Sequence, residues 1–304
     1  FDTAFRSWEN QKGYPVLNVR FDLSYQAFRL TQERFFEQKS YGVGDNSSWF
    51  IPLNYYTSTA GSADDTRATD YFFQGNPSMV IPVSQFNSDQ WVIFNKQQRS
   101  YYRVNYDRYI WQALSLTLSS DNFNKIHVMN RAQLIDDSFA LVVAGYLDDY
   151  ETAYDILKYL TREDDFFPWY SANRYISPLI TVFGFKDQTL QKFIRILSEK
   201  YYHKYKLDAS EKIPVDLLPE RYGRALAIQL SCESLGEECL SDTFALVHHF
   251  AMHDRKIPAG LEASVLCGGF RGDGKQDELV AVWRKMSLTS DPAFKSILIG
   301  SLGC

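Results

Sequence analysis

The stretch YYRVNYDRYIW, residues 101–111, marks the point where the chain changes its type of secondary structure. Up to Asp107 apolar and polar residues alternate, as Tyr102, Val104 and Tyr106 do, and this period of two is typical of a half-buried strand. After Asp107 the apolar residues recur at helical spacing. We therefore predict a β part that ends near Asp107 and an α part that follows it.

The same alternation occurs twice earlier, between turns rich in Gly, Asn and Ser. Its apolar positions are Leu17, Val19, Phe21 and Leu23, and then Trp49, Ile51, Leu53 and Tyr55. Pro52 within the second run indicates a strand at the edge of a sheet. We expect a small antiparallel β-sandwich over residues 15–107. Residues 1–14 are interpreted as a junction, a helix end or linker that leaves another domain.

Residues 108–304 carry several apolar stripes of helical period. The stripes are Ala153, Ile156, Leu157 and Leu160; Leu190, Ile194, Leu197 and Tyr201; and Leu279, Val282, Trp283 and Met286. The breaks between helices are placed at Pro168, Gly184, Pro214, Pro219, Gly236, Pro258 and Gly272. Roughly eight helices are predicted. Stacked helix pairs of the HEAT or armadillo kind are the expected architecture, with a compact helical domain as the alternative.

Composition narrows the class of protein. The 304 residues suit two domains, and 45% hydrophobic residues can fill real cores. The net charge of −5 gives no basic field for nucleic acid or anionic lipid. No apolar run approaches the ~18 residues of a membrane span. Because the chain opens on Phe1 without Met or a signal peptide, we expect it to be part of a longer protein.

Two histidines imitate the spacing of zinc ligands. His249 and His253 lie four residues apart, as in the HExxH motif of zinc peptidases. The general base of that motif would stand where Phe250 is, and the third ligand where Gly272 is. Adjacent acidic residues such as Asp136-Asp137 are more typical of helix ends and solvated faces. We therefore predict no catalytic residue and no metal ligand in this chain.

The four cysteines, Cys232, Cys239, Cys267 and Cys304, are an even number, which suits disulfides, although free thiols remain open. Seven residues of one straight helix span about 10 Å, too far for a disulfide. Cys232 and Cys239 can therefore bond only if the helix stops between them, and Gly236 is placed to stop it. A bond from Cys239 to Cys267 is the rival. Asn46-Ser47-Ser48 is the single acceptor sequence for N-glycosylation.

Seven short stretches recur in the order of a known family. They are WENQKGYPV at 8–16, ERFF at 33–36, WFIPL at 49–53, WVIFN at 91–95, YRVNYD at 102–107 with Trp111, NRAQLIDD at 130–137, and Pro168-Trp169. They resemble the membrane alanyl aminopeptidases (aminopeptidase N, the M1 zinc peptidases), above all the insect members. Glu33 and Tyr101 depart from the residues usual in the family.

The resemblance implies that the parent is a zinc-dependent aminopeptidase, a hydrolase that removes N-terminal amino acids from peptides. The family's GAMEN and HExxH motifs precede the junction at residue 8, so this chain alone would be inactive and would bind no cofactor. One zinc ion would lie in the missing catalytic domain of the same polypeptide. The helical domain would enclose the active-site cavity and limit access of the peptide substrates.

The resemblance also implies the disulfides Cys232–Cys239 and Cys267–Cys304. It places the parent, as a glycoprotein, on the extracellular face of the plasma membrane, through a GPI or transmembrane anchor outside this chain. An alternative function follows as well, because insect members that resemble this chain are midgut receptors for bacterial crystal toxins and targets of antibodies. The aromatic content of 16% fits a binding surface, although core filling is the interpretation we favour.

Overall fold

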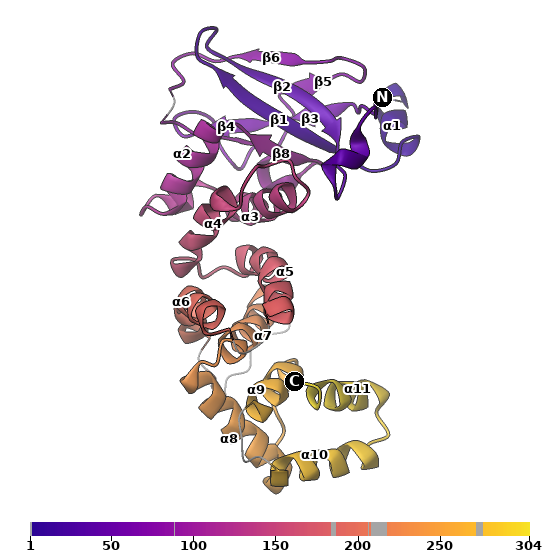
Figure 1. The fold of residues 1–304 in the computed structure, drawn as a ribbon, viewed down its shortest axis with the longest axis vertical. Coiled ribbons are helices and arrows are strands. Elements are labelled where there is room, and N and C mark those ends of the chain that lie inside the picture. Colours follow the sequence, from indigo (N-terminus) through magenta and orange to yellow (C-terminus); the bar gives the residue numbers. More distant parts are fainter. Residues whose placement is uncertain (1, 88, 184–186, 206, 208–217, 272–275) are drawn as a thin grey trace. The chain divides into compact units, whose positions relative to one another are not determined.

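The computed structural model describes residues 2–87, 89–183, 187–205, 207, 218–271 and 276–304 (Figure 1). The chain forms two compact units, Phe1–Tyr159 and Leu160–Cys304. Strands β1–β8 and helices α1–α4 lie in the first unit, and helices α5–α11 lie in the second. The predicted fold class, a small β part followed by an all-helical part, is confirmed.

The first unit contains a four-stranded sheet in the order β6-β2-β1-β8 and two short pairs, β3–β5 and β4–β7. The strands are β1 (Pro15–Asp22), β2 (Ala27–Arg34), β3 (Ile51–Leu53), β4 (Tyr55–Thr57), β5 (Asp70–Phe72), β6 (Met79–Pro82), β7 (Val92–Phe94) and β8 (Arg103–Tyr106). β1 and β2 form an antiparallel hairpin in which Pro15 pairs with Arg34. β8 departs from the antiparallel pattern, because it runs parallel to β1 and pairs Arg103 with Val16. A parallel pair needs a long connection, which residues 23–102, including the other strands, supply.

An aromatic cluster fills the space between the sheet and the β4–β7 pair. Phe28 on β2 meets Tyr55 and Phe94 edge-on, with ring centroids 6.2 and 5.9 Å away. Phe86 approaches the same ring to 4.9 Å. Such edge-to-face contacts add to the stabilisation that burial of aromatic surface gives. The core of the β part therefore joins its sheets, as expected for a sandwich.

Asp107 fixes the turn from the last strand into the first long helix. The helices of this unit are α1 (Asp2–Glu9), α2 (Arg108–Leu118), α3 (Val128–Val143) and α4 (Glu151–Leu157). One carboxylate oxygen of Asp107 accepts a hydrogen bond from Ile110 N at 3.0 Å, as an N-cap residue does. The other accepts one from Phe21 N of β1 at 2.7 Å. The change of period predicted at this residue thus coincides with a cap that also holds the sheet.

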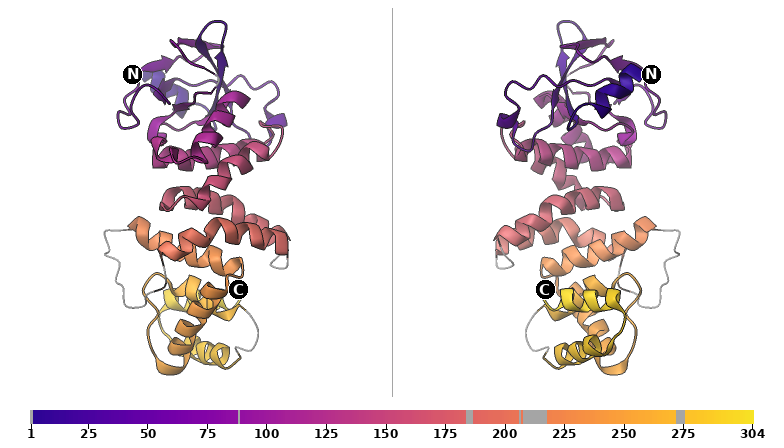
Figure 2. Two further views of the ribbon diagram at one scale, coloured as in Figure 1. Left: turned by 90° about the vertical axis from the view of Figure 1, so that its left-hand side faces the viewer. Right: turned by 90° about the vertical axis from the view of Figure 1, so that its right-hand side faces the viewer.

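The second unit consists of helices, each of which packs on the neighbouring helix along the chain, on the one beyond it, or on both (Figure 2). They are α5 (Phe166–Phe183), α6 (Gln188–Lys204), α7 (Leu218–Glu233), α8 (Glu237–His253), α9 (Glu262–Phe270), α10 (Gln276–Leu288) and α11 (Pro292–Ser301). Helix α6 packs on α7, α7 on α5 and α9, and α8 on α9 and α10. No helix in the described ranges has both the length and the apolar character needed to cross a bilayer.

After Asp107 the described residues form ten α-helices rather than the roughly eight predicted. Pro168 lies in the first turn of α5 instead of between helices, because proline costs no hydrogen bond there. Gly236 is the residue before α8, as predicted. The predicted breaks at Gly184, Pro214 and Gly272 fall outside the described residues. The domain boundary at residues 107/108 stays a prediction. The division into compact units is a different one and falls between Tyr159 and Leu160.

Helices α6 and α7 approach closely at Gly223. A Cβ atom on this glycine would lie 2.5 Å from Tyr205 Oη and 2.9 Å from Tyr201 Oη. Both tyrosines are buried, and Tyr201 stacks on Trp169 with ring centroids 4.7 Å apart. Rigid, enclosed rings cannot move aside for an added methyl group.

We therefore expect Gly223→Ala to destabilise the second unit by about 1–3 kcal/mol through overpacking. Gly300→Ala in α11 is the matched control, because nothing lies within 4 Å of a Cβ placed there. That control should be neutral or slightly stabilising, since alanine favours a helix over glycine. Urea unfolding followed by circular dichroism measures both. Equal unfolding midpoints for the two variants would contradict the close approach.

Candidate functional site

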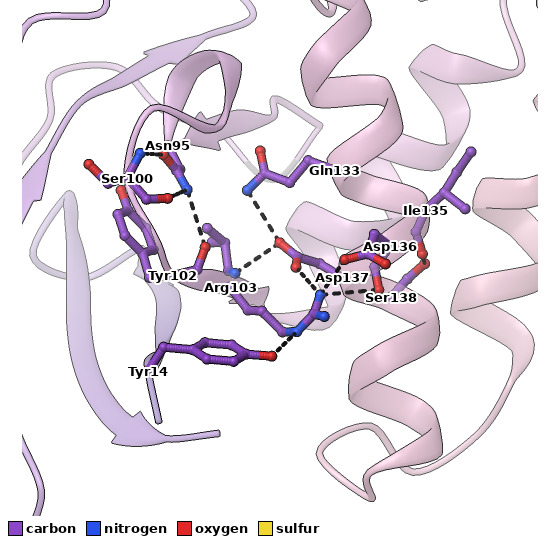
Figure 3. A network of polar contacts seen from close by, with 11 residues as sticks. Tyr14, Asn95, Ser100, Tyr102, Arg103, Gln133, Ile135, Asp136, Asp137 and Ser138 are labelled. Carbon is purple, nitrogen blue, oxygen red and sulfur yellow. Dashed lines mark hydrogen bonds and ion pairs between the residues drawn. The ribbon is translucent and has the colours of Figure 1, made fainter. Parts of the chain in front are cut away.

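Arg103 of β8 joins the sheet to helix α3 (Figure 3). Its Nη1 lies 2.6 Å from Asp136 Oδ2 and 2.9 Å from Asp137 Oδ1. Its Nε donates to Tyr14 Oη at 3.2 Å, and the guanidinium lies 5.1 Å from the centre of the Phe35 ring. The side chain is only 12% exposed. Arg103 is thus a largely buried cation whose partners come from several elements.

Asp137 uses both carboxylate oxygens. While Oδ1 faces Arg103, Oδ2 accepts hydrogen bonds from Val104 N at 3.0 Å and from Gln133 Nε2 at 3.2 Å. Burial raises the pKa of Asp137 to about 6, against the opposing effect of Arg103. Burial alone would lower the pKa of Arg103, but Asp137 and Asp136 raise it, and the net shift is upward. At neutral pH the pair is therefore ionised and occupied by its own partners.

The helix that carries Asp137 makes further polar contacts with the β part. Asn130 donates to the carbonyl of Asn95 at 3.0 Å and to Gln133 Oε1 at 2.7 Å. In return it accepts a hydrogen bond from Gln97 N at 3.0 Å. Asn95 has a left-handed backbone with φ of 60°, so this bend in the chain is held by side chains on α3. The stretch NRAQLIDD, residues 130–137, is therefore a row of contacts between helix and sandwich.

Tyr146 provides a second polar link. Its hydroxyl donates to the carbonyl of Arg34 and accepts from Phe36 N, both at 3.0 Å. Its ring stacks on Phe35 with centroids 5.7 Å apart. One side chain thus satisfies two backbone groups at the end of β2.

Helix α1 is clamped to the segment before β3. Trp8 Nε1 donates to the carbonyl of Phe50 at 2.8 Å. Gln11 donates to the carbonyl of Ser48 at 2.7 Å and accepts from Ser48 N at 3.1 Å. An isolated helix of this length would not be stable in water. The tryptophan and glutamine of WENQKGYPV are therefore the residues that hold α1 in place.

The histidines whose spacing imitates that of zinc ligands lie in the second unit, on α8. His249 and His253 lie on α8 with ring centroids 5.7 Å apart, and His248 Nδ1 is 2.8 Å from Glu278 Oε1. Phe250 packs its ring against Phe294, with centroids 6.1 Å apart. The histidine pair does not fit a peptidase zinc site, because an aromatic residue in a packed contact stands at the position of the base. Gly272 lies outside the described residues, and within those described no three His, Cys, Asp or Glu side chains gather to hold a metal.

The four cysteines lie as two pairs at disulfide distance, Cys232 with Cys239 and Cys267 with Cys304. The Cα atoms are 5.4 and 5.2 Å apart, within the range that a disulfide requires. Cys232 is 1% and Cys239 0% exposed, whereas Cys304 is exposed. Asn46 lies exposed in a loop before β3, where a glycan would meet no packed core.

The sequence motifs included Arg103, Asp136 and Asp137, but their mutual contact was missed. So were the roles of Gln133 and Tyr146. Residues 103 and 137 belong to different elements, and spacing alone does not bring such elements together. The available signal was a charged residue in a half-buried strand together with two adjacent acids inside a predicted helix.

We expect Arg103→Met to destabilise the first unit by about 3–5 kcal/mol, because it leaves Asp137 buried without a cation. Adding Asp137→Asn should recover part of the loss. Arg29→Met is the control, since Arg29 pairs with Asp22 at 2.8 Å on the surface, where its side chain is 50% exposed. Urea unfolding followed by tryptophan fluorescence gives the comparison. A loss of stability from Arg103→Met no larger than that from Arg29→Met would show that the contact of Arg103 with Asp136 and Asp137 does not stabilise the first unit.

The cysteine pairing generates a second test. Peptide mapping without reduction should recover Cys232 linked to Cys239 and Cys267 linked to Cys304. Under native conditions a mild dithiol should open the Cys267–Cys304 bond first, because Cys304 is exposed and Cys267 only half-buried, so that alkylation labels these two cysteines before the buried pair. Cys232 linked to any other cysteine, or four free thiols, would refute the pairing.

Comparison with known proteins gives the family. The model of the ERAP1-like C-terminal domain matches residues 91–304. Aminopeptidase N of Plutella xylostella is 33% identical over 98% of this chain and 31% of its own length. Membrane alanyl aminopeptidase of Heliothis virescens is 28% identical over 100% of this chain and 29% of its own length. Thyrotropin-releasing hormone-degrading ectoenzyme of Rattus norvegicus is 28% identical over 98% of this chain and 28% of its own length.

The match is confined to a fraction of these relatives. The chain spans less than a third of the length of each of them. The matched family model is that of a C-terminal domain, and it covers all the helices that follow the sandwich. The chain therefore belongs to the ERAP1-like C-terminal domain family and is similar, over its whole length, to a part of the insect aminopeptidases.

Proposed function

We propose that this chain is the non-catalytic sandwich and helical part of a zinc-dependent aminopeptidase that removes N-terminal amino acids from peptides. One observation carries the proposal. The residues that resemble the family, Trp8, Gln11, Arg103, Asp107 and Asp137, all make contacts that hold elements together. Their side chains hold the fold together, as expected for a part of an enzyme that does not itself carry the catalytic residues.

The two units would have different tasks. The first, in which Arg103 fixes β8 to α3, would be a stiff spacer next to the catalytic domain of the same polypeptide. The stacked helices of the second would enclose the active-site cavity and admit peptides while excluding folded proteins. The zinc ion and the general base would belong to the catalytic domain, since the histidines of α8 do not fit that role.

An extracellular location is part of the proposal. Two relatives carry the words membrane and ectoenzyme in their names. The two cysteine pairs suit an oxidising compartment, and the exposed Asn46 is open to glycosylation. The anchor, whether GPI or transmembrane, would lie outside this chain.

A receptor surface is the second candidate. Several tyrosines of the first unit are exposed, among them Tyr25, Tyr41 and Tyr101, and exposed aromatic side chains are enriched where proteins bind one another. A bacterial crystal toxin or an antibody would be the partner. Binding of a pore-forming crystal toxin to the purified chain, measured by surface plasmon resonance, would favour this candidate, and no binding at micromolar toxin would count against it.

We expect the purified chain to release no chromophore from alanine p-nitroanilide, with or without zinc, because Phe250 replaces the base. The longer polypeptide that contains it should hydrolyse the anilide and short peptides and should lose this activity to a chelator. It should leave a folded protein with the same N-terminal residue intact. Zinc-dependent turnover by the chain alone, or equal cleavage of folded proteins, would contradict the proposal.

A further inference from the structure

Three histidine rings gather near the C-terminal end of α8. The ring centroids of His249 and His253 are 5.7 Å apart. The ring of His248 lies 5.8 Å from that of His253 and 6.1 Å from that of His249. Two imidazoles that share one zinc ion, each with a Zn–N bond of about 2.1 Å, have centroids about 5–6 Å apart. The spacing of His249 and His253 therefore leaves room for one ion between their rings.

The rings of His249 and His253 are not committed to other contacts. Among the described residues, none forms a hydrogen bond with a ring nitrogen of either histidine, although Nδ1 of His249 is buried. His253 is exposed, so its ring is accessible from solvent. An ion can therefore bind these two rings without displacing an existing partner.

His248 is oriented by a carboxylate on another helix. Its Nδ1 lies 2.8 Å from Oε1 of Glu278 on α10, and Glu278 is only 7% exposed. A carboxylate at one ring nitrogen holds the proton there and fixes the orientation of the imidazole, as it does around bound metals. Nε2 of His248 is then an acceptor beside the other two rings, where it can receive a hydrogen bond from a water molecule on the ion.

The electrostatic surroundings favour a cation. His253 is the last residue of α8 (Glu237–His253), and His249 lies one turn before it. The C-terminal end of a helix carries the negative end of its dipole and stabilises positive charge. The ammonium group of Lys285 forms an ion pair with Asp254, the residue after the helix, so its positive charge is partly offset.

We propose that His249 and His253 bind one divalent transition metal ion of the kind that prefers imidazole, such as Zn²⁺ or Cu²⁺. Only two protein side chains are assigned as ligands, because no three His, Cys, Asp or Glu side chains of the described residues gather around one point. Water fills the remaining positions. Phe250, which rules out a peptidase site, does not matter here, since an ion that only binds needs no general base. The inference departs from the absence of metal ligands predicted from the sequence, and it does not depend on the proposed function.

Titration of the untagged chain with metal salts tests the site. With one equivalent of Cu²⁺, electron paramagnetic resonance should show hyperfine splitting from two imidazole nitrogens. Calorimetry should give one Zn²⁺ per chain, and Mg²⁺ should not compete, because Mg²⁺ prefers oxygen ligands. Fewer than two nitrogens, or several Zn²⁺ ions bound with equal affinity, would mean an adventitious ion only and would overturn the proposal.

Histidine variants locate the ion. His253→Ala should weaken Zn²⁺ binding at least ~tenfold, because two linked donors bind far more tightly than one. His203→Ala is the matched control, since His203 also lies in the last turn of a helix and is 52% exposed, but no histidine stands four residues from it. The control should bind Zn²⁺ as the unchanged chain does. Equal affinities for the two variants, with circular dichroism showing both folded, would overturn the proposal.

A third variant separates ligand from neighbour. His248→Ala should keep both nitrogens in the Cu²⁺ spectrum and weaken binding less than His253→Ala does, because it removes only a partner of the bound water. Loss of a nitrogen signal in His248→Ala would show that His248 is itself a ligand and would overturn the assignment to His249 and His253.

Discussion

The contact on which the first unit depends is the pairing of Arg103 with Asp136 and Asp137. A buried guanidinium loses its hydration, and two carboxylates within 2.9 Å offset this loss only if strand and helix hold their places. The amide of Val104 donates to the same Asp137, so α3 contacts both the backbone and a side chain of β8. Displacing either element would expose the cost of an unpaired buried charge. The arrangement thus penalises every alternative packing of these two elements.

Local features of the fold could be predicted because they depend on neighbouring residues. The period of two before Asp107 and the helical period after it follow from which face is buried. Gly236 was correctly predicted to separate two helices because glycine rarely continues one. Pro168 was wrongly predicted to lie between helices. A proline in the first turn of a helix cannot be told in sequence from a proline just after a helix end.

Nonlocal features could not be predicted. The parallel pairing of β8 with β1 depends on how a long connection folds back. The stripe of α10 shows the same limit. Val282 and Met286 are buried as its period predicts, but Leu279 and Trp283 are exposed, because periodicity gives a face and not what covers it. The candidate site follows this division, since its motifs were visible and the contact between Arg103 and Asp137 was not.

Asp107 links the helix cap to the sheet, and this has a consequence for the order of folding. Its two carboxylate oxygens bind Ile110 N, three residues away, and Phe21 N, far back in the chain. The first bond can form as soon as α2 begins, whereas the second must wait until β1 and β8 have met across a long loop, which is slow. The early helix would therefore carry a partly free carboxylate that favours the correct strand when it arrives. Closure of the sandwich and completion of the cap would then form a single late, cooperative event.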